Sequence, residues 1–187
     1  MKHIATVALM LNLGVAGVYA QQQKPVKMTF SGTVGGTTAK LQPDTNNDEL
    51  NVAGNGTLGP FTFREIHADT ASPQPSSTCS PGNAPPRLYY PTVAGGGVFR
   101  FQDGSLLTVK LTEGSSYCIN LMAMVGHLTT NYQITGGTGR FEGASGALTL
   151  TAIMTPVLLP GLGTSTGEFE GTVSGVAIGE DGQDERH

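Results

Sequence analysis

The sequence contains no tryptophan, 2 cysteines and 4 histidines among its 187 residues. Without tryptophan, neither a typical lipocalin signature nor an aromatic platform for carbohydrates is expected. The histidines show no zinc-ligand spacing, and the chain has no Gly-Lys-Ser/Thr phosphate loop and no Gly-x-Ser-x-Gly nucleophile elbow. Lys and Arg, 10 in total, are scattered singly and the net charge is −4, which disfavours a nucleic-acid partner. We therefore expect no metal and no cofactor.

A long uncharged run occurs at the start of the chain, from Ile4 to Ala20. Lys2 precedes it, and it ends in Val18-Tyr19-Ala20, with small residues where signal peptidase reads them. The run predicts a secretory signal peptide over residues 1–20 and a secreted or periplasmic protein with no membrane span after cleavage. A single membrane anchor is the alternative, although the run is at the short limit for spanning and no basic cluster follows it.

Apolar and polar residues alternate along much of residues 21–178, and no segment shows the pattern of an amphipathic helix. Such strands, separated by glycine turns, are typical of sandwiches and barrels, so we predict one all-β domain. The polar segment Pro43–Glu49 is expected to be a solvated loop, with calcium binding as the weaker alternative. Residues 179–187 are expected to form a disordered acidic tail. The clearest strands are predicted at Val26–Val34, Phe61–Asp69, Gly97–Gln102, Tyr117–Thr135 and Thr166–Ile178.

The two cysteines, Cys79 and Cys118, are expected to form a disulfide, because an even pair in an exported chain most simply means one bond. A reactive thiol or a metal ligand is the rival interpretation, weakened because neither cysteine has a second Cys or His at ligand spacing. Cys79 lies in a Pro-rich segment that we predict as a loop over residues 71–91. A loop of this length is a lid, a binding loop or a disordered segment.

One short pattern occurs twice. Phe30–Val34 and Phe169–Val173 both read Phe-x-Gly-Thr-Val, in the first and last predicted strands. A glycine between two large inward side chains allows a strongly coiled strand or close packing at a seam. We therefore expect these strands to pair and to close a barrel, which removes both sheet edges.

The segment Tyr132–Thr151 predicts a strand, a tight glycine turn and a second strand, with Gly136, Gly137 and Gly139 supplying positive φ values. Its core, Gly-Gly-Thr-Gly-Arg-Phe-Glu-Gly-Ala-Ser-Gly, resembles the hairpin of the allene oxide cyclase-like barrels. That family includes plant allene oxide cyclases, dirigent proteins and many bacterial secreted proteins. The motif residues are Gly136, Gly137, Gly139, Arg140, Phe141 and Gly143.

The resemblance implies a closed antiparallel eight-stranded barrel of the calycin type, with an apolar cavity and assembly into dimers or trimers. In the family this motif acts as a turn and packing device, which implies a core position for Phe141 and a rim position for Arg140. We expect Arg140 to pair with a local carboxylate such as Glu142 or with a carbonyl at the turn, with anion binding as the lesser alternative. The family's catalytic residues lie on other strands, so none is carried over.

The strand Phe61–Asp69 holds the strongest candidates for chemistry. Glu65, His67 and Asp69 share a face with the phenylalanines of this strand, so a barrel interior that takes the rings would also take the polar groups. A carboxylate beside an imidazole in an apolar cavity suits general acid–base catalysis, which makes Glu65 and His67 the candidate catalytic residues. The favoured alternative is that the strand leaves the sheet near Glu65 or bulges, so that the three groups are solvated.

Seven side chains are expected to line a ligand cavity, with ordinary packing as the alternative for the methionines and the tyrosine. They are Phe61, Phe63, Phe99, Phe101, Met122, Met124 and Tyr132. His127 has the opposite parity to its apolar neighbours and is expected at the surface.

These features predict a secreted barrel that binds a small apolar ligand in its cavity. One alternative is an isomerase or cyclase that acts on a lipid-like or phenolic substrate. Another is a non-catalytic adhesion or matrix module that uses the Pro-rich loop.

Overall fold

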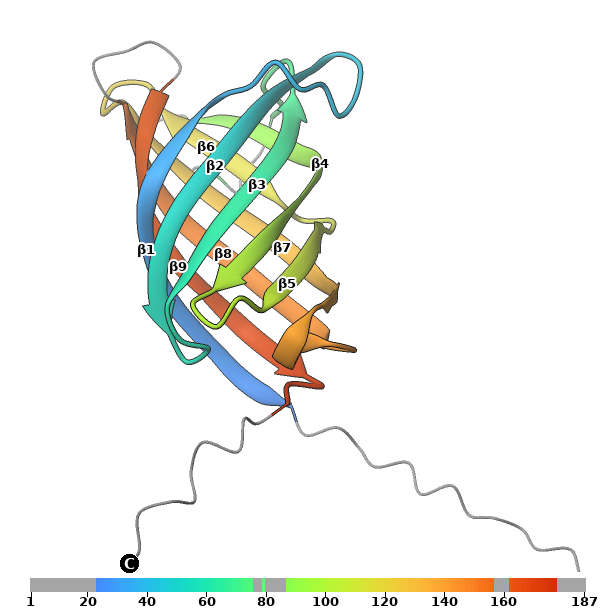
Figure 1. Cartoon of the computed structure of the whole chain (residues 1–187). Coiled ribbons are helices and arrows are strands. Elements are labelled where there is room, and N and C mark those ends of the chain that lie inside the picture. The colour runs from blue at the N-terminus through green and yellow to red at the C-terminus, as the bar shows by residue number, and fades with distance from the viewer. Residues whose placement is uncertain (1–22, 76–78, 80–86, 157–161, 178–187) are drawn as a thin grey trace, which may run out of the picture.

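The computed structural model describes residues 23–75, 79, 87–156 and 162–177 (Figure 1). The predicted signal peptide and acidic tail lie outside these residues. In the described part of the chain, no helix is long and apolar enough to cross a membrane. The strands are β1 Lys24–Gly36, β2 Thr45–Gly56, β3 Phe61–Thr70, β4 Leu88–Phe101, β5 Leu106–Leu111, β6 Ser116–Asn120, β7 Val125–Gly137, β8 Ser145–Pro156 and β9 Leu162–Ser174, and a 3-10 turn, η1, spans Gly139–Phe141.

These strands form one closed antiparallel barrel (Figure 1). β5 and β6 each pair with both β4 and β7, so together they occupy one strand position in the barrel. The nine described strands therefore form an eight-stranded barrel. β9 returns to pair with β1, with Phe169 opposite Met28 and Gly167 opposite Phe30. The predicted fold class and the predicted pairing of the first and last strands are therefore confirmed.

Glycines allow the two strands of this seam, β9 and β1, to approach their other neighbours, β8 and β2, closely. A Cβ atom added to Gly167 would lie 2.1 Å from the carbonyl oxygen of Thr151 on β8, closer than real Cβ contacts come. The same addition at Gly32 would meet the Asn51 carbonyl oxygen at 2.1 Å. The glycine of the repeated Phe-x-Gly-Thr-Val pattern in β1 is thus needed for backbone packing.

We expect Gly167→Ala to lower the free energy of unfolding by about 2–3 kcal/mol or more, because the new methyl group overlaps backbone that has no room to move. Urea unfolding measures the change. Gly36→Ala is the matched control, since a Cβ there meets nothing closer than 3.9 Å. Equal stability of the two variants would contradict the close approach at the seam.

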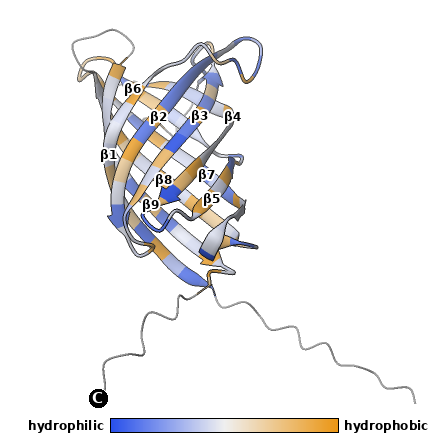
Figure 2. Ribbon diagram, viewed as in Figure 1, coloured by the Kyte–Doolittle hydropathy of each residue, from blue (hydrophilic) through white to orange (hydrophobic). Residues whose placement is uncertain are grey.

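Aromatic rings fill one part of the barrel interior. Phe63 and Phe99 have ring centroids 4.3 Å apart, and Phe99 and Phe169 are 4.9 Å apart. Hydrophobic and hydrophilic residues alternate along the strands in Figure 2, as expected when one face of each strand is buried. Ring pairs at these separations make a packed core. The predicted ligand-lining side chains Phe61, Phe63, Phe99, Phe101 and Tyr132 all belong to it.

The glycine-rich hairpin motif closes one end of the barrel, between β7 and β8. Gly136, Gly139 and Gly143 have positive φ, as a reversal requires, but Gly137 does not, which corrects that part of the prediction. Gly137 serves a close approach instead, since an added Cβ would lie 2.2 Å from the Leu106 carbonyl oxygen. The connection is also longer than a tight turn, because η1 intervenes and buries the Phe141 ring.

Arg140 ties this connection to two others. Its Nη2 donates to the Leu58 carbonyl oxygen at 2.5 Å, and its Nε lies 3.1 Å from Asp103 Oδ2. The guanidinium also lies over the Phe101 ring, 4.8 Å from its centroid, where cation–π attraction acts. The predicted pairing with Glu142 is therefore wrong, because the side chain reaches across the end of the barrel to neighbouring hairpins.

The predicted strand Tyr117–Thr135 is two strands separated by an exposed turn. Asn120 caps this turn, since its Oδ1 accepts hydrogen bonds from the backbone N–H groups of Met122 and Ala123, both at 3.1 Å. Met122 is 90% exposed and Met124 57% exposed. The prediction that these methionines line a cavity or the core is therefore wrong. The apolar–polar alternation of the sequence runs on through these residues, although the turn that Asn120 caps interrupts the strand there.

Two predicted loops are shorter than expected. The Pro-rich loop ends before Leu88, where β4 begins, and only Cys79 is described within its central part. β2 begins at Thr45, so most of Pro43–Glu49 is strand. Asp48 has the same parity as buried Leu50, and for this reason it faces the barrel interior. The disulfide between Cys79 and Cys118 is confirmed.

Candidate functional site

The inward face of β3 carries three buried titratable side chains. Glu65 and His67 are each 1% exposed, and Asp69 is 3% exposed. β3 is paired with β2 along its whole length and with β4 from Phe61 to Asp69, and its one irregularity falls between Ala68 and Asp69. The strand therefore does not leave the sheet near Glu65. The favoured expectation that these groups are solvated is wrong, and they continue the interior face begun by the phenylalanines.

Glycines on the neighbouring strand make room for these side chains. Gly97 lies opposite Glu65, and Gly95 lies opposite His67. An added Cβ at Gly95 would lie 2.9 Å from His67 Cβ, and one at Gly97 would lie 2.5 Å from the Phe63 ring. The Ala-Gly-Gly-Gly run of β4 thus leaves the space beside Glu65 and His67 to their own side chains.

The three groups contact one another along the strand. His67 Nδ1 lies 3.6 Å from Glu65 Oε1, and His67 Nε2 lies 3.8 Å from Asp69 Oδ2. Asp69 also accepts a hydrogen bond of 2.6 Å at Oδ1 from the Thr92 hydroxyl on β4. Neither imidazole contact is short enough for a hydrogen bond. The histidine is therefore placed between two carboxyl groups without being paired to either.

Several buried polar atoms at this site have no hydrogen-bond partner in the described part of the chain. They are both Glu65 carboxyl oxygens, His67 Nδ1, the Thr130 hydroxyl and the Tyr132 hydroxyl. Tyr132 packs its ring 6.1 Å from that of Phe63, and its hydroxyl faces Glu65 without a hydrogen bond of standard geometry. An unpaired buried polar group costs about 1–3 kcal/mol, so such a group of atoms needs an explanation.

Burial controls the protonation of these groups. It raises the pKa of the Glu65 carboxyl to about 8, an effect that the nearby Tyr132 hydroxyl partly opposes and Asp69 increases. Burial lowers the pKa of His67 to about 4. It also raises the pKa of Asp69 to about 7, against the opposing hydrogen bond from Thr92. At neutral pH the Glu65 carboxyl is mainly protonated and the imidazole is neutral, so the site can donate and accept hydrogen bonds without carrying full charge.

Two further residues complete the description of the predicted sites. His127 lies half-buried on the outer side of β7, opposite Cys118, and does not approach Glu65. The polar residues around Asp48 predict a loop, yet Asp48 lies in β2, directly opposite His67. Extending the alternation of Leu50 and Val52 back by two residues would have placed Asp48 inside.

Two solved structures of dirigent proteins are similar to this chain. The structure is similar to the pterocarpan synthase dirigent protein PsPTS1, with a TM-score of 0.44 and 14% identity over 84% of this chain and 97% of that one. It is also similar to the pterocarpan synthase dirigent protein GePTS1, with a TM-score of 0.43 and 15% identity over 90% and 98% of the two chains. No model of a known protein family matches the sequence, and no curated protein matches it. Assembly into dimers or trimers, which the resemblance of the hairpin motif implies, stays a prediction.

Proposed function

We propose that the barrel binds a small organic molecule that has one hydrogen-bonding end and an apolar body. The observation that carries this proposal is the group of unpaired buried atoms on Glu65, His67, Thr130 and Tyr132. A ligand group that pairs with two or three of these atoms would relieve about 1–3 kcal/mol for each. The Tyr132 ring packs 6.1 Å from the Phe63 ring, so the apolar body of a ligand held at the Tyr132 hydroxyl would lie toward the aromatic core.

The chemistry of the site favours a neutral ligand. A protonated Glu65 carboxyl and a Tyr132 hydroxyl can each donate and accept, which matches a phenol or an alcohol. A charged group would have to enter surroundings that already penalise the ionised carboxylate, and no Lys or Arg forms an ion pair with Glu65 among the described residues. Phenolic and lipid-like alcohols are therefore the ligand classes we expect.

Calorimetric titration with p-cresol and with 1-octanol tests the proposal. We expect at least one of them to bind the wild-type protein at one site per chain. Glu65→Leu removes two of the hydrogen-bonding atoms of the site and should weaken binding by about 10- to 100-fold, whereas Glu65→Gln keeps hydrogen-bonding atoms there and should stay within a few-fold of wild type. Equal affinity of Glu65→Leu and wild type would refute the assigned site.

Neither p-cresol nor 1-octanol has a bond that acid–base catalysis can rearrange, so these titrations test binding alone. A lipid-like β,γ-unsaturated ketone tests the isomerase alternative, because a general acid–base pair can move its double bond. Conversion by the wild-type protein, with loss of conversion in His67→Ala, would support catalysis at the Glu65–His67 pair, and recovery of the ketone unchanged would favour a binding module. The adhesion alternative rests on the Pro-rich segment, most of which lies outside the described residues, and stays a prediction.

A further inference from the structure

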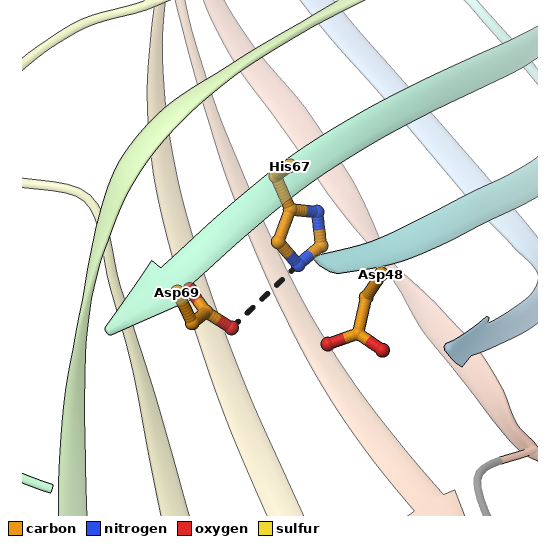
Figure 3. A group of neighbouring side chains, drawn as sticks. All are labelled: Asp48, His67 and Asp69. Carbon is orange, nitrogen blue, oxygen red and sulfur yellow. Dashed lines mark ion pairs between the residues drawn. The ribbon is translucent and has the colours of Figure 1, made fainter. Parts of the chain in front are cut away.

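Asp48, His67 and Asp69 form a compact group on the inward face of the barrel, where the start of β2 pairs with the end of β3 (Figure 3). Asp48 is the cross-strand partner of His67, and Asp69 follows His67 by two residues on the same strand. Directly opposite residues and residues two apart on one strand project from the same face of a sheet. One donor atom from each side chain lies within 4.8 Å of the others.

We propose that these three side chains bind a divalent transition-metal ion of the Zn²⁺ class. One imidazole nitrogen and two carboxylate oxygens are the donor types that Zn²⁺ accepts, and three protein ligands leave one coordination position open. Asp48 is half-buried, while His67 and Asp69 are buried.

The separations suit one shared ion. Two ligand atoms at about 2.1 Å from a common metal are at most about 4.2 Å apart. The 3.8 Å between His67 Nε2 and Asp69 Oδ2 is within this limit and too long for a hydrogen bond. Any longer separation involves Asp48, which is half-buried and whose side chain has no hydrogen bond or ion pair to another described residue.

A second observation points to an ion rather than to a simple cluster of acids. The His67 side chain is 2% exposed, makes no hydrogen bond to a described residue, and directs one nitrogen toward Asp69, with the Asp48 carboxylate nearby (Figure 3). Among the described residues other than Arg87, no Lys or Arg forms an ion pair with either aspartate. The Thr92 hydroxyl donates to Asp69 Oδ1 at 2.6 Å and leaves Oδ2 toward the histidine, as hydrogen bonds that orient metal-ligating carboxylates do.

The test uses the full secreted chain without a histidine tag, treated with EDTA and dialysed. Zn²⁺ is titrated calorimetrically, with Ca²⁺ for comparison. We expect one Zn²⁺ per chain with micromolar or tighter affinity and at least 10-fold weaker binding of Ca²⁺. Asp48→Asn and Asp69→Asn should each weaken Zn²⁺ binding at least 30-fold. Glu49→Gln, which removes the adjacent carboxylate on the outer side of β2, should stay within two-fold of wild type.

Two results would overturn the metal site. One is the absence of stoichiometric Zn²⁺ binding to wild type up to 1 mM, and the other is unchanged affinity in the Asp48→Asn/Asp69→Asn double variant. If the variants do not fold, imidazole NMR of the wild type decides, because Zn²⁺ must shift the His67 signals and leave those of His127 in place. Binding of p-cresol or 1-octanol in the presence of EDTA tests the organic ligand separately, so either proposal can fail alone.

Discussion

Glu65→Gln is expected to remove most of the loss of stability that the wild-type protein shows between pH 5 and pH 8. The folded protein holds the Glu65 carboxyl at a pKa of about 8, raised from 4.5 by burial. A raised carboxyl pKa means that the folded state keeps its proton while the unfolded chain loses it. The contribution of this group is therefore fully present below pH 4.5 and is lost as the pH rises toward 8. A glutamine cannot ionise, so its variant lacks this dependence.

The size of the effect follows from the shift. At about 1.4 kcal/mol per pKa unit, and with pH 5 to 8 covering about 3 of the units between the two pKa values, the wild type should lose on the order of 3–4 kcal/mol more than Glu65→Gln across this range. Asp69, whose pKa burial raises to about 7, acts in the same direction and remains in the variant. His67 acts in the opposite direction, because its lowered pKa costs stability as the pH falls from 6.5 to about 4. Comparing the two proteins isolates Glu65.

Urea unfolding at pH 5, 6, 7 and 8 with EDTA present measures these free energies. The matched control is Glu49→Gln, because Glu49 pairs with Arg64 on the outer side and burial contributes little there. If the free energy of unfolding depends on pH equally in wild type and Glu65→Gln, then Glu65 titrates as an exposed carboxyl. That result would contradict a buried site at Glu65.

Removing the disulfide is expected to cost about 4 kcal/mol of stability. Cys79 and Cys118 are separated by 39 residues, and a cross-link over a loop of this length restricts the unfolded chain by about that amount in the chain-entropy model. The Cys79→Ala/Cys118→Ala variant should therefore unfold at clearly lower urea concentration at pH 7. Reductant added to the wild type should reproduce this result, and native oxidised protein should contain no titratable thiol. A loss below about 1 kcal/mol would mean that the bond adds little constraint.

The bond also bears on where the protein resides. Disulfides persist in oxidising compartments, so the Cys79–Cys118 bond is consistent with an extracellular or periplasmic protein. The signal peptide predicted from residues 1–20 remains the more direct indication, and it lies outside the described residues.

Strand parity was the sequence feature that predicted the site best. The alternation Phe61, Phe63, Glu65, His67 made Glu65 and His67 candidates for the barrel interior, because a paired strand keeps its faces for its whole length. What parity could not decide was whether β3 stays in the sheet beyond Phe63. That depends on pairing with both β2 and β4, which are distant in sequence.

The predictions that proved wrong concern places where a single side chain or the strand register, rather than the local apolar–polar pattern, determines the structure. Asn120 caps a turn that breaks an otherwise continuous alternation, so Met122 and Met124 point to solvent. Arg140 is long enough to reach Asp103 and Leu58, and no local pattern indicates which hairpins meet at the end of a barrel. The register of β2 against β3 places Asp48 opposite His67. The polar residues around Asp48 gave no sign in the sequence that it belongs to a strand.

A crystal structure of the wild-type protein grown with p-cresol or with 1-octanol would show directly whether the barrel interior binds a ligand. We expect the ligand hydroxyl within hydrogen-bond distance of Glu65 and Tyr132, with the apolar body beside Phe63. A competing place exists on the outside of β1 to β4, where Arg64 and Arg100 border a hollow of about 620 Å³. Ligand bound only in that hollow, with Glu65 and Tyr132 hydrogen-bonded to each other inside, would contradict an interior binding site.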